Sequence, residues 1–132
     1  MPASSRPTTG VAVLALLAVI DISWLVQAWF GVLGSSDAPP TGALILFALV
    51  GVVTLVTVRP ALQGNRTAAW IMIASRVVSV LLIDLPALVL GAPVWVDVVV
   101  SVAILLTALG VWWTAPLLSR AGAARAATRA AV

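Results

Sequence analysis

The sequence AAWIMIASRVVSVLLIDLPALVL, residues 68–90, decides the fold of this chain. Its apolar length is enough to cross the hydrocarbon core of a bilayer, which takes about 20 residues of helix at about 1.5 Å per residue. Arg76 nevertheless places a full positive charge near the middle of the stretch, where hydrocarbon is expected. We therefore expect a membrane-spanning helix whose central charge has a partner on another helix.

The composition is that of a membrane protein. Of the 132 residues, 63% are hydrophobic and 8% are charged, whereas a soluble domain has about 45–50% and about 25%. Small domains leave much of their surface exposed, so a chain this short cannot hide the excess in one core, and lipid must surround most of it. All seven cations are Arg and all four anions are Asp. This usage, with abundant Ala, Val and Gly, suggests a high-GC bacterium and its inner (plasma) membrane.

Four long apolar runs predict an all-α fold, a compact four-helix transmembrane bundle. A cleaved signal peptide is the rival interpretation of the first run, but its apolar region would have about 7–15 residues and would end in small residues. The run here is longer and contains Trp24 and Trp29, which favours a retained helix. We predict a cytoplasmic tail at 1–10, a transmembrane domain at 11–118 with spans at about 11–33, 41–59, 67–90 and 93–118, and an Arg/Ala-rich cytoplasmic tail at 119–132.

The distribution of Arg predicts that both termini are cytoplasmic. The first tail has Arg6, the loop between spans two and three has Arg59 and Arg66, and the last tail has three more. The loops after spans one and three have none, which is the positive-inside pattern. Tryptophans near both ends of the spans match an aromatic belt. The Arg residues of the last tail touch anionic lipid in this interpretation, as a topology anchor and not as a lipid-binding site.

Asp21 and Arg76 lie at similar depth in the first and third spans. A lone charge at that depth costs roughly 2.5–3.5 kcal/mol, and opposite charges relieve each other, since the guanidinium fork holds a carboxylate well. Ser75 and Ser79 flank Arg76, could donate further bonds, and have the spacing of small residues at close helix contacts. We predict that Asp21 and Arg76 touch. The pair either lines or gates a polar path, or it is a structural clasp, that is, a buried ion pair that sets how the four helices register. The lack of a third buried charge nearby favours the clasp.

Asp84 precedes Pro86 by two residues, and two interpretations are open. If the helix continues to Leu90, Asp84 lies inside the bilayer and needs a partner. If it breaks near Asp84, this residue is an interfacial cap, which we favour. On a regular helix Arg76 and Asp84 are about 12 Å apart along the axis and about 80° apart in rotation, so no direct bond between them is expected. Asp97, in the first turns of the fourth span, suits a helix N-terminus.

The residue inventory predicts no enzyme, no metal and no cofactor. Cys and His are absent, and no nucleophile–base pair or phosphate-binding glycine loop is visible. We expect a non-enzymatic integral membrane protein that acts by association, as a homo-oligomer or as an accessory subunit of a membrane complex. Its partners are then the lipid bilayer and a second copy or another membrane protein, and not nucleic acid. The alternative is a small proton-coupled transporter that uses Asp21 as its protonation site.

Three segments of the chain resemble segments of two known families of membrane proteins. The basic turn RPALQGNRTAAW and the close of the fourth span, WWTAPLLSRAG, resemble the small four-span integral membrane proteins of unknown function from actinobacteria, which implies a fold and no activity. The segment LALLAVID, ending in Asp21, resembles the first span of the small multidrug resistance transporters, which are four-helix proteins with an essential acid there. This chain differs from them in having Asp instead of Glu, in lacking their later aromatic motifs and in carrying Arg76.

Overall fold

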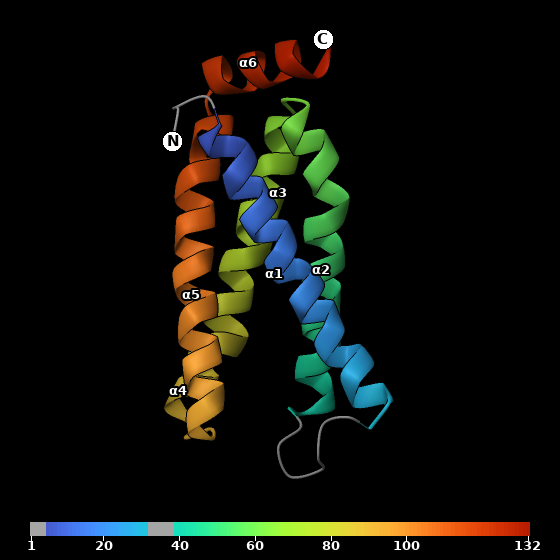
Figure 1. Ribbon diagram of the computed structural model, residues 1–132, viewed down its shortest axis with the longest axis vertical. Helices are drawn as coiled ribbons and strands as arrows, with labels where there is room; N and C mark the ends of the chain where they lie inside the picture. The colour runs from blue at the N-terminus through green and yellow to red at the C-terminus, as the bar shows by residue number, and fades with distance from the viewer. Residues whose placement is uncertain (1–4, 32–38) are drawn as a thin grey trace.

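The computed structural model describes residues 5–31 and 39–132, whose regular structure is helical throughout (Figure 1). Four helices are long and apolar enough to cross a membrane, which confirms the predicted all-α class and the number of membrane-length helices among the described residues. They are α1 (Arg6–Trp29), α2 (Thr41–Leu62), the helix made of α3 (Arg66–Ser79), the π-helical turn η1 (Val80–Asp84) and α4 (Leu85–Val89), and α5 (Val94–Thr114) extended by the 3-10 turn η2 (Ala115–Leu118). A further helix, α6 (Arg120–Ala130), follows.

Helix α1 is the central packing element of the bundle. It packs against both α2 and α5, while α2 also packs against α3. Helices α1 and α3 are therefore diagonal to each other, and α1 crosses obliquely over the bundle in Figure 1. Both described chain ends and the turn between α2 and α3 lie at the same end of the bundle, and α6 lies across that end (Figure 1). We call it the Arg-rich end, because every Arg except Arg76 belongs to the segments found there.

Three helix boundaries differ from the sequence-based prediction. Helix α1 begins at Arg6, inside the predicted tail, because Pro7 has a backbone that suits a first helical turn. It ends at Trp29, and Gly31 turns the chain with a φ of +67°; the predicted boundary at residue 33 and Asp37 fall outside the described residues. Helix α2 continues past Pro60, which lies in its last turn. At that position a proline removes one hydrogen bond without ending the helix earlier.

Glycines allow α1 to approach its two neighbours closely. A methyl group on Gly51 of α2 would lie 2.8 Å from the carbonyl oxygen of Ala18 on α1. A methyl group on Gly10 of α1 would lie 2.8 Å from the carbonyl oxygen of Gly110 on α5. Small residues at helix crossings let backbones meet and strengthen van der Waals packing in lipid. The close contacts of this bundle thus centre on α1, whereas the sequence pointed to the Ser75 and Ser79 pair on α3.

The apolar core occupies the half of the bundle next to the Arg-rich end. It draws on all four spans and is made of Val11, Leu14, Ala61, Ala68, Ala69, Met72 and Leu117. Farther from that end the buried residues include three charged side chains, Asp21, Arg76 and Asp84. The helices therefore pack an apolar core at one end and enclose a polar interior beyond it.

Candidate functional site: a buried cluster of charges

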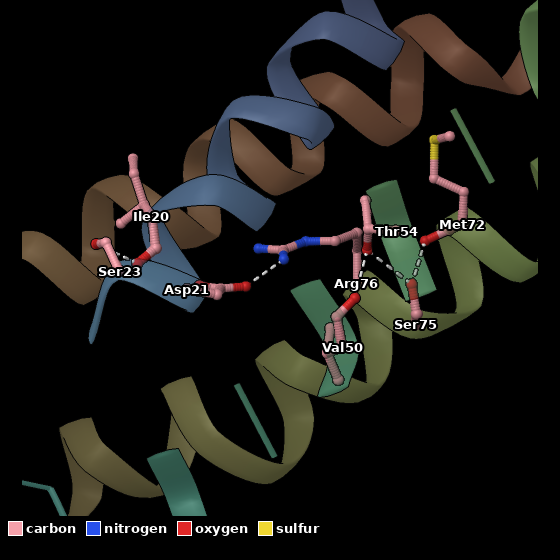
Figure 2. A network of polar contacts seen from close by, with 8 residues as sticks. All are labelled: Ile20, Asp21, Ser23, Val50, Thr54, Met72, Ser75 and Arg76. Atoms are coloured by element: carbon pink, nitrogen blue, oxygen red, sulfur yellow. Dashed lines mark hydrogen bonds and ion pairs between the residues drawn. The ribbon is translucent and has the colours of Figure 1, made fainter. Parts of the chain in front are cut away.

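Arg76 and Asp21 form an ion pair inside the bundle, as predicted from their depth. The Nη1 group of Arg76 donates a hydrogen bond to Oδ2 of Asp21. Figure 2 shows the Arg76 side chain extended from α3 toward Asp21 on α1, so the long guanidinium stem spans the diagonal of the bundle. The residues are 1% and 7% exposed, respectively. Each relieves the other of the cost of an unpaired charge in an apolar surrounding.

Ser75 contributes to the interior, but not by bonding Arg76. Its Oγ donates to the carbonyl oxygen of Met72, 2.8 Å away, and lies 3.1 Å from Oγ1 of Thr54 on α2. Thr54 in turn donates to the carbonyl oxygen of Val50 at 2.8 Å. Figure 2 shows this hydroxyl pair beside the base of the Arg76 side chain. The pair joins α2 to α3, and Ser75 donates its hydrogen bond within its own helix and not to the Asp21–Arg76 pair.

Several buried polar atoms near this level have no hydrogen-bond partner among the described residues. They include Nε of Arg76, Oγ of Ser79 and Oγ1 of Thr107. Ser79 is almost fully buried, yet the hydrogen bond that its hydroxyl was expected to donate is absent among the described residues. Buried polar groups in native proteins are usually bonded, so each exception calls for an explanation. A purely structural clasp would be expected to satisfy the guanidinium more fully.

Asp84 corrects the sequence-based interpretation, because it is not an interfacial cap. It is 5% exposed, and its side chain makes no capping bond to α4. The helix does not break before Pro86; it continues from Arg66 to Val89. Asp84 is buried in the same bundle as Asp21 and Arg76, on the same continuous helix as Arg76. A third buried charge therefore accompanies the pair, and the premise that favoured a clasp is wrong.

The π-helical turn η1 explains why Asp84, like Arg76, is buried inside the bundle. A π-turn bonds residue i to i+5, so it holds one residue more than an α-turn and turns the following residues back by roughly 100°. The offset of about 80° on a regular helix thereby falls to within roughly 20° of Arg76. Pro86 supplies a local reason for the wider turn, since a proline ring clashes with the carbonyl four residues earlier, here that of Leu82.

An aromatic pair lies beyond the cluster, toward the end opposite the Arg-rich end. The rings of Trp24 on α1 and Trp95 on α5 stack with centroids 6.1 Å apart and planes inclined by 15°. Asp97 lies in the first turn of α5, as predicted, and its Oδ1 is buried without a hydrogen-bond partner in the described part of the chain. Trp24 is one helical turn from Asp21, so the stack links α1 to α5 on the side of the charged cluster that faces away from the Arg-rich end.

Buried threonine hydroxyl groups of α2 and α5 also line the interior of the bundle. Thr54 and Thr57 come from α2, and Thr107 and Thr114 come from α5. The two threonines of α5 were not predicted from the sequence. The available signal was their spacing with Gly110, which puts three small or polar residues of an otherwise apolar helix on one face.

Comparison with known proteins adds no relative: no protein family, no curated protein sequence and no solved structure matches this chain. The resemblances to four-span actinobacterial proteins and to small multidrug resistance transporters therefore stay predictions. The chemistry of the site has to be argued from the buried cluster itself.

Proposed function

We propose that this chain is a small proton-coupled transporter of the bacterial plasma membrane, not an enzyme, and that Asp84 and Asp21 share the transported proton. The observation that carries the proposal is the place of Asp84, buried on the same continuous helix as Arg76. Ionisable residues inside membrane spans are expensive to bury and typically belong to ion paths or proton relays.

The charge count supports a site that binds one proton. Asp21 and Asp84 carry two negative charges when both are ionised, and Arg76 carries one positive charge. The cluster is therefore neutral only when it holds one proton. A clasp is complete with Asp21 and Arg76 alone, and a third charge adds a burial cost on the order of 2.5–3.5 kcal/mol that a clasp does not require. Proton binding and release give that third group a role.

Polar groups on both sides of the cluster support a path for the proton. Asp97 has a buried carboxylate oxygen on the side of the Trp24 and Trp95 stack. The hydroxyls of Thr107 and Thr114 lie along the interior face of α5 and have no bond within the described part of the chain. Hydroxyls both donate and accept hydrogen bonds, so they suit a relay. Asp21 is engaged by Arg76, which leaves Asp84 as the carboxyl better placed to exchange the proton.

A vesicle assay tests the proposal. The protein is reconstituted in vesicles that contain a pH-sensitive dye, a pH gradient is imposed, and K⁺, Na⁺ or tetraphenylphosphonium is added as a trial cation. We expect proton flux above that of protein-free vesicles with at least one cation. Asp84→Asn and Asp21→Asn should each lower it about tenfold or more, which is the scale of a lost proton carrier. Asp97→Asn, a change of the same chemistry outside the cluster, should lower it less.

Two results would overturn the proposal. One is the absence of flux above protein-free vesicles with every trial cation. The other is a flux that Asp84→Asn leaves unchanged, because proton transfer would then not use the buried carboxyl. Helicity and melting temperature of each variant, measured in the same detergent, separate loss of the proton carrier from loss of the fold.

Association through α5 is a second candidate function, and a specific observation favours it. Only 11% of the apolar stretch of the span Val94–Leu118 is buried inside the protein, against 28–33% for the other three spans. Its exposed face includes Leu105 and the small residues Ser101 and Ala108. Small residues on a lipid-facing helix allow a second helix to approach closely. Association would make the chain a homo-oligomer or a subunit of a larger membrane complex.

Cysteine cross-linking tests the association. The natural chain has no Cys, so Leu105→Cys introduces one thiol on α5, and Leu82→Cys is a control of similar exposure on η1. We expect oxidation in native membranes to join Leu105→Cys chains into covalent dimers and to leave Leu82→Cys chains monomeric. Equal cross-linking of the two variants would indicate random collision and would contradict association through α5.

The orientation of the bundle is part of the same proposal. All six Arg residues outside the bundle interior belong to the start of α1, the last turn of α2, the start of α3 and α6, which lie together at one end (Figure 1). The positive-inside rule places that end, and hence both termini, in the cytoplasm.

A further inference from the structure

A groove at the Arg-rich end is lined by both apolar and basic residues. It has a volume of about 740 Å³ and lies between the start of α1, the end of α2, η2 and α6. Apolar side chains of Val58, Leu62 and Leu117 form part of its wall. Arg59 from α2 and Arg125 from α6 also line it, together with Arg129. This volume is in the range of small-molecule sites, about 300–1,000 Å³.

The path of the chain after η2 creates this groove. Ser119 has an extended backbone, and its Oγ caps α6 by accepting a hydrogen bond from the Gly122 N–H at 2.9 Å. A side chain on Gly122 would collide with the carbonyl oxygen of Pro116, and one on Gly64 with that of Ala123. Helix α6 is thus pressed against the α2–α3 turn. Nε of Arg66 adds a hydrogen bond of 2.7 Å to the carbonyl oxygen of Leu118.

The charge in the groove is of one sign. None of the three acidic residues that the structure describes, Asp21, Asp84 and Asp97, lines it. Arg59 and Arg125 come from different helices, so the fold brings two basic residues to one groove. Planar guanidinium groups suit phosphate oxygens, which they bind through paired hydrogen bonds. The complementary occupant is an anion with a phosphate group.

The depth of the groove indicates the source of that phosphate. Trp70 near the start of α3 and Trp112 near the end of α5 are exposed close to the same end of the bundle. Tryptophans in this position lie at the level of lipid head groups. An apolar wall beside two cations also matches the boundary between a head group and its acyl chains. Basic pockets of this kind on the cytoplasmic side of membrane proteins hold anionic lipids.

We infer that the groove is a specific binding site for an anionic phospholipid. Arg59 and Arg125 bind the head-group phosphate, and Val58 and Leu62 pack against the glycerol and the first part of the acyl chains. The sequence predicted only a topology anchor from the Arg residues of the tail, because it could not place Arg59 beside α6. This site is separate from the charged cluster and does not depend on the proposed transport.

Native mass spectrometry of the full chain in a neutral detergent tests the inference. Phosphatidylglycerol and phosphatidylcholine with identical acyl chains are the probes, with inorganic phosphate as a competitor. We expect phosphatidylglycerol to bind at least about tenfold more tightly than phosphatidylcholine, since each basic residue near a lipid surface has a sizeable effect. Arg59→Gln with Arg125→Gln should bring this preference to about twofold or less. Excess inorganic phosphate should not displace the lipid.

The matched control is Arg6→Gln with Arg120→Gln. Both residues are exposed at the same end of the bundle but do not line the groove, and the double change removes the same net charge. It should leave the lipid preference within about twofold of the natural chain, because the groove keeps both of its guanidinium groups. If the two double variants lose the preference equally, diffuse surface charge explains the binding and the specific site does not exist. Displacement by inorganic phosphate would also overturn the inference, since the site would then bind free phosphate.

A third variant keeps every charge and fills the space instead. Ala126, on α6, lines the groove and is partly buried. Ala126→Phe should reduce phosphatidylglycerol binding about tenfold by occupying the lipid volume, with helicity unchanged. Unchanged binding in a folded Ala126→Phe chain would place the lipid elsewhere and contradict the inference, even if the Arg variants proved too unstable to purify.

Discussion

Arg76 on α3 donates a hydrogen bond to Asp21 on α1 across the diagonal of the bundle. These two helices pack mainly against other partners, α1 against α2 and α5, and α3 against α2. The bond therefore links elements that backbone packing alone leaves apart. It also fixes the depth at which the polar interior begins, beyond the apolar core of the Arg-rich end.

A double-mutant cycle measures this link. Asp21→Leu leaves the Arg76 guanidinium, which cannot lose its charge, with Asp84 as the remaining buried carboxyl, whereas Arg76→Leu leaves two carboxyls that can each take up a proton. We expect each single change to lower the free energy of unfolding, and the double change to cost less than the sum of the two. The coupling energy from thermal melts in detergent should be at least about 1 kcal/mol. Single losses that simply add would contradict a direct interaction.

Asp84→Asn should keep the fold and remove the excess charge. The amide has the shape of the carboxylic acid and stays neutral, so the cluster then holds one anion and one cation. We expect the melting temperature in detergent at neutral pH to be no lower than that of the natural chain. Asp84→Leu is the comparison, because it also removes the hydrogen-bonding capacity. A marked drop for Asp84→Asn would mean that an ionised Asp84 stabilises Arg76, contrary to this interpretation of the third charge.

Gly51→Ala should separate α1 from α2. Its new methyl group would lie 2.8 Å from the carbonyl oxygen of Ala18 and 2.8 Å from Cγ1 of Ile22, and the backbone oxygen cannot move without shifting α1. We expect a loss of about 1–3 kcal/mol in the free energy of unfolding, as for other overpacked sites.

The control lies on the same helix. A methyl group on Gly42 meets no atom within 4 Å, so Gly42→Ala should change stability by about 0.5 kcal/mol or less, or raise it through better helix propensity. Equal effects of the two substitutions in chemical denaturation would show that the α1–α2 crossing does not depend on Gly51.

Reporter fusions test the orientation. A reporter that is active only in the periplasm should be silent when fused after Val132 and active when fused after Asp37, because Arg-rich segments stay in the cytoplasm. A cytoplasmic reporter should give the opposite pattern at both points. Activity of the periplasmic reporter after Val132 with silence after Asp37 would invert the bundle, and would place the lipid groove on the outer leaflet.

The sequence alone was enough to predict the four membrane-length helices and the contact between Asp21 and Arg76. Helix length and hydropathy depend on local composition, and the ion pair follows from matching two opposite charges by depth in a medium that disfavours lone charges. Even the position of Asp97 follows locally, since one helix terminus sets it.

Only the tertiary structure decided the place of Asp84 and the site formed by Arg59 and Arg125. The direction of Asp84 depends on whether one turn before Pro86 bonds i to i+4 or i to i+5, and that choice rotates a side chain by roughly 100° while leaving the apolar pattern unchanged. Arg59 and Arg125 line one groove because α6 folds back over the end of α2. Hydropathy assigns each residue a depth, but rotation about the helix axis and the meeting of distant segments arise only when the helices pack.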